Sequence, residues 1–211
     1  MEIRPASDRS LLVSFGSEIS LEAHRQVRAL VEHLQAAPAV LNLHPAYASV
    51  LIDFDPRRRS HRDIEELVRA RMSLALEKTE QEARILEIQV SYGGSAGPDL
   101  EDVARHTGLT ASRVVELHSS ALYLVYFLGF SPGFPYLGGL PPALATPRLS
   151  APRKRVPAGS IAIGGSQAGI YPVESPGGWR IIGSTSLRLF DPGADPPARL
   201  GIGDHVRFVP V

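Results

Sequence analysis

The chain has 211 residues, of which 44% are hydrophobic and 21% are charged, a composition typical of a soluble globular protein with one large or two small domains. Lys and Arg together number 22, as do Asp and Glu, so no net charge favours nucleic acid or an anionic membrane as a partner. The absence of cysteine excludes disulfides, thiol nucleophiles and zinc–thiolate sites, and no apolar run approaches the roughly 20 residues of a membrane span. The opening residues lack an apolar signal core, so we expect a cytoplasmic protein.

The first 82 residues combine short strand patterns with two helical patterns. Helices are predicted after Ser20 and Ser60, because each serine can cap a helix and is followed by apolar residues at helical spacing. Strands are predicted where apolar and β-branched residues cluster between turn signals, at residues 11–15, 40–43 and 49–54. The order is roughly ββαββα, which predicts a small α+β domain over residues 1–82, with helices on one face of an antiparallel sheet.

The charged stretch from Glu77 to Arg84 is a candidate domain boundary, after which strand patterns return. Asp99 and Thr110 are predicted to cap two short helices. Strands are predicted at residues 85–90, 122–128, 160–163, 180–182, 186–190 and 205–209. Several short strands separated by turns are typical of a barrel or sandwich, so we expect a mainly-β domain over residues 83–211.

Residues 127–180 are exceptionally rich in glycine and proline. They contain ten of the chain's 19 glycines and nine of its 18 prolines. Flexible linkers can have such a composition, but they lack the aromatic and β-branched residues that are distributed through this segment. Glycine permits close backbone approach and proline fixes φ. The segment is therefore predicted to be a rigid loop surface, where binding and chemistry are often found.

Familiar catalytic motifs are missing from the chain. The glycine-rich residues 164–169 lack the lysine of a phosphate-binding loop, which favours tight turns between strands. No serine lies in a G-x-S-x-G elbow, and the histidines do not have the spacing of metal ligands. Each histidine, His118 included, is more simply interpreted as a helix-terminal or packed side chain. The motifs therefore give no support for a nucleotide site, a serine nucleophile or a metal centre.

Cationic side chains occur at Arg148 and in the run Arg153-Lys154-Arg155, which lies between Pro152 and Pro157. The planar guanidinium group suits a carboxylate or a phosphate, whereas most runs of charge are simply solvated. Both interpretations stay open, with Arg153 facing an anion or a partner chain in the first. Because prolines hold this loop, replacing Arg153 by alanine is expected to cost little stability.

Four motifs between residues 127 and 183 resemble the KipI / allophanate hydrolase subunit 1 family. They are FLGFSPGFPY at 127–136, Pro152-Arg153, VPAGSIAI at 156–163 and IYPVESPGGWRIIG at 170–183. The resemblance extends more weakly over essentially the whole chain. It implies that the C-terminal domain is a cyclophilin-like barrel of the carboxyltransferase C/D type, preceded by the small α+β domain.

The same resemblance implies one component, inactive alone, of a bacterial ATP-dependent 5-oxoprolinase, which hydrolyses 5-oxo-L-proline to L-glutamate. The implied partners are a homologous C-type chain, similar to allophanate hydrolase subunit 2, and an A-type chain of the LamB/YcsF family. ATP with Mg is expected at a site shared with them, and no metal or prosthetic group is expected in this chain. Two alternatives stay open: an allophanate hydrolase component in urea degradation, and a KipI-like inhibitor of a sporulation histidine kinase.

Opening a lactam through a phosphorylated amide oxygen requires cations and backbone donors around the developing charge. The candidate catalytic residues are Arg153, Arg148 and His118. The candidate substrate- or partner-binding residues are Phe134, Tyr136, Ser160, Gln167, Tyr171 and Trp179. Tyr171 and Trp179 could form a stacking wall for a ligand or close the core of the barrel, and the sequence leaves both possibilities open.

Overall fold

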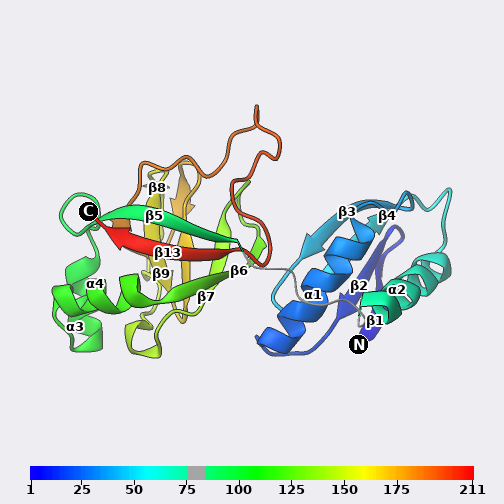
Figure 1. The fold of residues 1–211 in the computed structure, drawn as a ribbon, viewed down its shortest axis with the longest axis horizontal. Coiled ribbons are helices and arrows are strands. Elements are labelled where there is room, and N and C mark those ends of the chain that lie inside the picture. Colours follow the sequence, from blue (N-terminus) through cyan, green and yellow to red (C-terminus); the bar gives the residue numbers. More distant parts are fainter. Residues whose placement is uncertain (76–83) are drawn as a thin grey trace. The chain divides into compact units, whose positions relative to one another are not determined.

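The structure is a computed structural model and describes residues 1–75 and 84–211. The chain divides into two compact units, Met1–Glu82 and Ala83–Val211, each with its own sheet and helices (Figure 1). Of the boundary predicted at Glu77 to Arg84, all but the last residue lies outside the described residues.

The N-terminal unit is a four-stranded antiparallel sheet with two helices. The strand order is β1-β2-β4-β3. Leu11 pairs with Ile52 and Val13 with Val50, and all four side chains are buried in the core between the sheet and the helices, which also pack against each other. The elements are β1 Glu2–Ser7, β2 Ser10–Ser14, α1 Leu21–Leu34, β3 Val40–Pro45, β4 Ser49–Phe54 and α2 His61–Ala75.

Both helices of this unit begin where the sequence places a cap. The Ser20 hydroxyl accepts a hydrogen bond from the Ala23 N–H at 3.0 Å. Ser60 and Asp63 form a reciprocal pair, in which the Asp63 carboxylate accepts from the Ser60 N–H at 2.8 Å and the Asp63 N–H donates to the Ser60 hydroxyl. Local side-chain bonds of this kind satisfy the free N–H groups of the first turn.

The predicted order ββαββα includes two strands before the first helix, but no residues were assigned to the one that the structure forms as β1. Strand β1 pairs with β2 alone, at the edge of the sheet, and almost all of its residues are exposed. An edge strand needs no apolar face and tolerates Pro5, so it lacks the alternating pattern by which strands are recognised.

The C-terminal unit is built on a closed seven-stranded barrel, which confirms the predicted β-barrel; its likeness to cyclophilin stays a prediction. The strand order is β10-β7-β6-β13-β5-β12-β9, and β8 and β11 form a separate two-stranded ribbon. The barrel strands are β5 Ile85–Tyr92, β6 Leu122–Leu128, β7 Pro135–Gly138, β9 Ser160–Gly164, β10 Gln167–Ile170, β12 Arg180–Ser184 and β13 His205–Pro210. The ribbon strands are β8 Arg153–Val156 and β11 Ser175–Gly177.

Strands β5 and β13 are parallel neighbours, with Ile85 opposite His205 and Val90 opposite Pro210 (Figure 1). The alternation predicted for β5 is present, since Ile88 and Val90 are buried and Gln89 between them is exposed. Helices α3 Leu100–Thr107 and α4 Ala111–Ser120 pack against the barrel, and the short 3-10 helix η1 covers Pro142–Leu144.

The strand predicted at residues 186–190 is wrong. Leu189 is buried as the pattern suggested, but the segment makes only an isolated bridge between Phe190 and Ala198. Its apolar residues pack onto the core, but the segment forms no ladder with another described strand. The apolar pattern therefore predicted burial correctly and a strand wrongly. Within residues 1–75 and 84–211, no helix combines the length and apolar character needed to cross a bilayer.

Candidate functional site

The glycine- and proline-rich segment folds around six aromatic rings, which we call the aromatic cluster. Its members are Phe127, Phe130, Phe134, Tyr136, Tyr171 and Trp179. Phe134 lies at the centre and is buried, and its ring makes edge contacts with four others at centroid distances of 5.1–5.7 Å. Phe130 is the most exposed member and has a φ of 66°, which is rare for a residue with a side chain. Phe134, Tyr171 and Trp179 are buried in a second apolar core, so for Tyr171 and Trp179 the structure favours core packing over a stacking wall for a ligand.

Two glycines of this segment are required by the close approach of the rings. A Cβ atom at Gly164 would lie 2.5 Å from the ring of Trp179, and one at Gly169 would lie 2.7 Å from the ring of Phe134. Because neither distance is compatible with a side chain, the backbone here serves as a wall against which the rings pack. The high glycine content therefore reflects packing and not flexibility.

Arg148 lies at the edge of the aromatic cluster. Its guanidinium carbon is 5.5 Å from the centroid of the Trp179 ring, within the range of a cation–π interaction. The next residue, Leu149, donates its N–H to the Gly178 carbonyl at 2.7 Å, which fixes this part of the chain beside Trp179. Arg148 itself is exposed and available to a ligand.

Arg153 was expected in a loop, but it lies on strand β8 and already faces an anion of its own chain. Its Nη2 donates to Asp99 Oδ1 at 2.6 Å, and the Asp99 side chain is only 4% exposed, against 31% for Arg153. The second terminal nitrogen, Nη1, is shielded from solvent and has no hydrogen-bond partner among the described residues. The solvated-loop interpretation of Arg153 is therefore wrong.

The Tyr171 hydroxyl group lies within electrostatic range of Arg148 and Arg153. Burial raises the pKa of Tyr171, while a hydrogen bond with the Trp179 backbone and the positive charges of Arg148 and Arg153 act in the opposite direction. Both guanidinium groups are therefore close enough to the phenol to act on it electrostatically. Of the predicted residues, the structure brings together Arg148 and Arg153 with Phe134, Tyr136, Tyr171 and Trp179.

Ser160 and Gln167 lie next to this site at the starts of β9 and β10. The Ser160 hydroxyl is buried and donates to the Pro157 carbonyl at 2.8 Å, while its own carbonyl accepts from the Tyr171 N–H. Gln167 is half-buried and pairs with Gly164 in the ladder between the two strands. Ser160 thus supports the backbone beside Tyr171, and its hydroxyl is already engaged within the chain.

His118 is not brought to this site. It lies in α4, is fully buried, stacks on Phe208 at 4.6 Å and makes a 2.8 Å hydrogen bond between Nδ1 and the Tyr92 hydroxyl. Burial lowers the pKa of His118 to about 3, so the ring is neutral at physiological pH. The whole ring is packed in the main barrel core against Tyr123 and Phe208, so the structure favours a packing role over the predicted catalytic one.

Asp99 has a role that its sequence context conceals. It occupies the N-cap position of α3, as predicted, but its side chain makes no capping hydrogen bond. Its carboxylate instead binds Arg153 through Oδ1 and the Ile181 N–H through Oδ2, the latter at 2.7 Å. The only sequence signal was its place in the Gly-Pro-Asp-Leu stretch before the helix, which also fits an ordinary cap.

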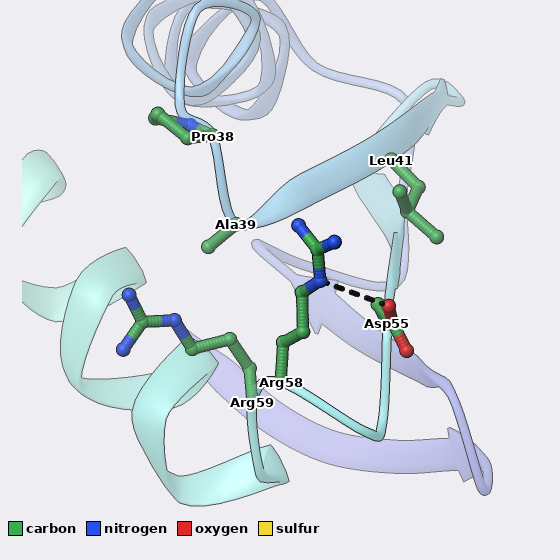
Figure 2. Close-up of a pocket in the computed structure, with 6 residues that line it drawn as sticks. All are labelled: Pro38, Ala39, Leu41, Asp55, Arg58 and Arg59. Atoms are coloured by element: carbon green, nitrogen blue, oxygen red, sulfur yellow. Dashed lines mark ion pairs between the residues drawn. The ribbon is translucent and has the colours of Figure 1, made fainter.

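A cavity of about 570 Å³ lies in the N-terminal unit, away from all of these residues in the sequence (Figure 2). It is lined by Pro38, Ala39, Leu41, Asp55, Arg58 and Arg59. The Arg58 Nε lies 3.5 Å from Asp55 Oδ2, and both arginines are exposed. None of the predicted site residues lines it. Across the described ranges 1–75 and 84–211, no group of three or more acidic or histidine side chains could hold a metal ion.

The chain belongs to the family described as the carboxyltransferase domain, subdomain C and D, whose model matches residues 1–200. It is 46% identical to the B subunit of 5-oxoprolinase from Escherichia coli O157:H7, over 96% of this chain and 93% of that protein. It is 39% identical to the protein of the same name from Bacillus subtilis, over 99% of this chain and 92% of that protein. The crystal structure of TTHA0988 has a TM-score of 0.86 and 41% identity, with 96% of this chain matching 40% of that longer chain.

Proposed function

We propose that this chain is the B component of an ATP-dependent 5-oxoprolinase, which hydrolyses 5-oxo-L-proline to L-glutamate. The observation that carries the proposal is the 46% identity, over nearly the full length of both chains, to a protein named as the B subunit of 5-oxoprolinase. Because that name describes one subunit, it supports an enzyme of several chains. We assign as partners a homologous C-type chain and an A-type chain of the LamB/YcsF family, and a cytoplasmic location stays a prediction.

The chemistry of the proposed reaction fits the cationic edge of the aromatic cluster. Transfer of the terminal phosphoryl group of ATP to the lactam oxygen, with ADP as the leaving group, would activate the ring carbon for attack by water. The tetrahedral intermediate would break the ring C–N bond, with a proton going to the amine nitrogen, and leave an acyl phosphate. A second water would hydrolyse this acyl phosphate to the carboxylate and free phosphate. Negative charge develops on oxygen at each stage, and Arg148 and Arg153 could stabilise it. The aromatic rings would exclude water from around these charges and strengthen the interaction.

The site is proposed to be complete only in the assembled enzyme. The described residues of this chain offer no metal-binding cluster, and its sequence has neither a phosphate-binding loop nor a nucleophile motif. We therefore place ATP and Mg at a site shared with the partner chains. The isolated chain is expected to show no hydrolysis of ATP that depends on 5-oxoproline, and full turnover by it alone would refute the shared site.

The test is the activity of the complex reconstituted from the three chains, with Arg153→Ala and a matched control. Arg155 lies on the same strand, is 78% exposed and pairs with Glu174 at the surface. Loss of a charge-assisted hydrogen bond to the substrate, worth about 1.5–3 kcal/mol, would lower activity roughly ten- to a hundred-fold in Arg153→Ala. Arg155→Ala should stay within about two-fold of the wild type.

Stability has to be measured alongside activity, because Arg153 also neutralises Asp99. Its removal leaves a buried carboxylate whose remaining hydrogen-bond donor is the Ile181 N–H, at a cost of about 1–3 kcal/mol. The sequence predicted almost no loss of stability for Arg153→Ala. The structure raises the loss that we expect in the free energy of unfolding. Full activity of Arg153→Ala would refute this site, and turnover of allophanate in place of 5-oxoproline, or inhibition of a histidine kinase by the chain alone, would replace the proposed function.

A further inference from the structure

Asp99 forms a clamp between α3 and β12. Its N–H donates to the Ile181 carbonyl at 2.8 Å, and its Oδ2 accepts from the Ile181 N–H at 2.7 Å. The residue is therefore bound to one backbone position of the barrel through both its main chain and its side chain. Because the side chain is also buried, the carboxylate has little freedom to change its orientation.

The remaining oxygen of this clamped carboxylate binds only one half of the Arg153 guanidinium group. Asp99 Oδ1 accepts from Nη2 at 2.6 Å, whereas Nη1 has no hydrogen-bond partner among the described residues although it is shielded from solvent. Buried donors are nearly always paired, and an unpaired N–H on a cation is costly. Arg148, the neighbouring cation at Tyr171, cannot satisfy it, because a guanidinium group accepts no hydrogen bonds.

We infer that Asp99 is a positioning residue, which holds Arg153 by Nη2 so that Nη1 is left to bind an oxygen anion of the reacting complex. Because Nη1 is shielded from solvent in this chain, a path to it has to open when the complex assembles. The ligand class is a carboxylate or phosphoryl oxygen, both of which the guanidinium group binds through its N–H groups. The inference rests on the proposed function, because it makes Arg153 the group that meets the substrate. This role explains why the Asp99 carboxylate binds Arg153, 54 residues away in the sequence, instead of capping α3.

Asp99→Asn separates the two bonds of the clamp. The asparagine oxygen can still accept from the Ile181 N–H, but its amide nitrogen would face the Arg153 donors and release the guanidinium group. We expect the melting temperature to fall no further than in Arg153→Ala, because the partly exposed Arg153 side chain can turn towards solvent. The activity of the three-chain complex should fall about ten- to a hundred-fold. Asp102→Asn is the matched control, since Asp102 lies on the same helix, is 41% exposed and pairs with Arg105 and Arg180; its activity should stay near the wild-type level.

A double-mutant cycle shows whether Asp99 acts through Arg153. If Asp99 acts only through Arg153, removing Asp99 has no further effect once Arg153 is gone. The double variant should therefore be no less active than Arg153→Ala alone. Strictly additive losses, or full activity of Asp99→Asn, would overturn the inference. If Asp99→Asn fails to fold, Arg153→Lys decides the matter: it keeps a cation beside Asp99 but has no second terminal nitrogen, so an active Arg153→Lys complex would refute the role of Nη1.

A measurement without turnover separates this inference from the proposed function. In the isolated wild-type chain, NMR of the arginine side chains should show one guanidinium group whose N–H protons exchange slowly, and Asp99→Asn should abolish that signal. If the wild-type complex hydrolyses no 5-oxoproline, the proposed function fails while this result still establishes or refutes the clamp. Rapid exchange of every guanidinium group in the wild-type chain would overturn the inference directly.

Discussion

His118 should make the stability of the C-terminal unit depend on pH well above the range in which carboxylates titrate. Burial holds the pKa of the folded imidazole at about 3, whereas an unfolded chain has the ordinary value of 6.5. Between these values the unfolded state binds more protons than the folded state, so acidification favours unfolding. The stability is therefore fully present above about pH 6.5 and decreases as the pH falls towards 3.

The size of the effect follows from the two pKa values. Between pH 7 and pH 5 the unfolded state becomes almost fully protonated at this site and the folded state does not, so the free energy of unfolding should fall by about 2 kcal/mol. The carboxyl groups with lowered pKa, such as Asp53 and Glu174, start from values of 3.8 and 4.5 and contribute mainly below pH 5. Comparing the wild type with a variant that lacks the imidazole, from pH 7 to pH 5, therefore isolates the contribution of His118.

The assay is urea unfolding at pH 7 and pH 5, followed by the fluorescence of Trp179. This is the chain's single tryptophan, so its signal reports on the C-terminal unit alone. His118→Asn is the comparison, because the shorter amide can still reach towards the Tyr92 hydroxyl but does not titrate. The pH effect should be present in the wild type and absent from the variant. An equal loss of stability in both, or no loss in either, would refute the argument and reopen a catalytic role for His118.

Three further predictions concern packing, capping and domain organisation. Gly164→Ala should lower the free energy of unfolding by about 1–3 kcal/mol and shift the fluorescence of Trp179, while Gly178→Ala, whose Cβ would meet nothing closer than 3.6 Å, should be nearly neutral in the same denaturation experiment. Ser20→Ala should cost the N-terminal unit about 1 kcal/mol, measured by circular dichroism during urea unfolding, and an unchanged midpoint would contradict the cap. The fragment 85–211 should unfold cooperatively on its own, and a circular dichroism spectrum of an unfolded chain would exclude independent folding.

The parts of the fold that the sequence predicts well are those decided within a few residues. The caps at Ser20 and Thr110 are present because a hydroxyl group needs only the N–H three residues later. The alternation in β5 is present because one face of that strand meets the core. Residues 186–190 have the same apolar pattern but form no strand. Hydrophobicity is a property of the residues themselves, whereas a strand ladder also needs a partner from elsewhere in the chain.

The site illustrates the same division between local and distant interactions. Its aromatic residues and glycines are concentrated in one segment, so the composition alone indicated a rigid surface there. The partner of Arg153 lies 54 residues earlier in the chain, where Asp99 has the appearance of an ordinary helix cap. His118 follows the buried Val114 by about one helical turn, so the alternative of a packed histidine was available from the sequence, and the structure favours it.

The parallel pairing of β5 and β13 gives the C-terminal unit an order of assembly. Strand β13 lies between β6 and β5 in the barrel, so until residues 205–210 are in place these two neighbours are the edges of an open sheet. The first and last strands of the unit must therefore find each other across more than a hundred residues, a distant contact of the kind that slows folding. During synthesis, the barrel can close only after β13 has left the ribosome. Until then β5 and β6 expose unpaired edges, and loss of this one strand by truncation would leave them exposed permanently.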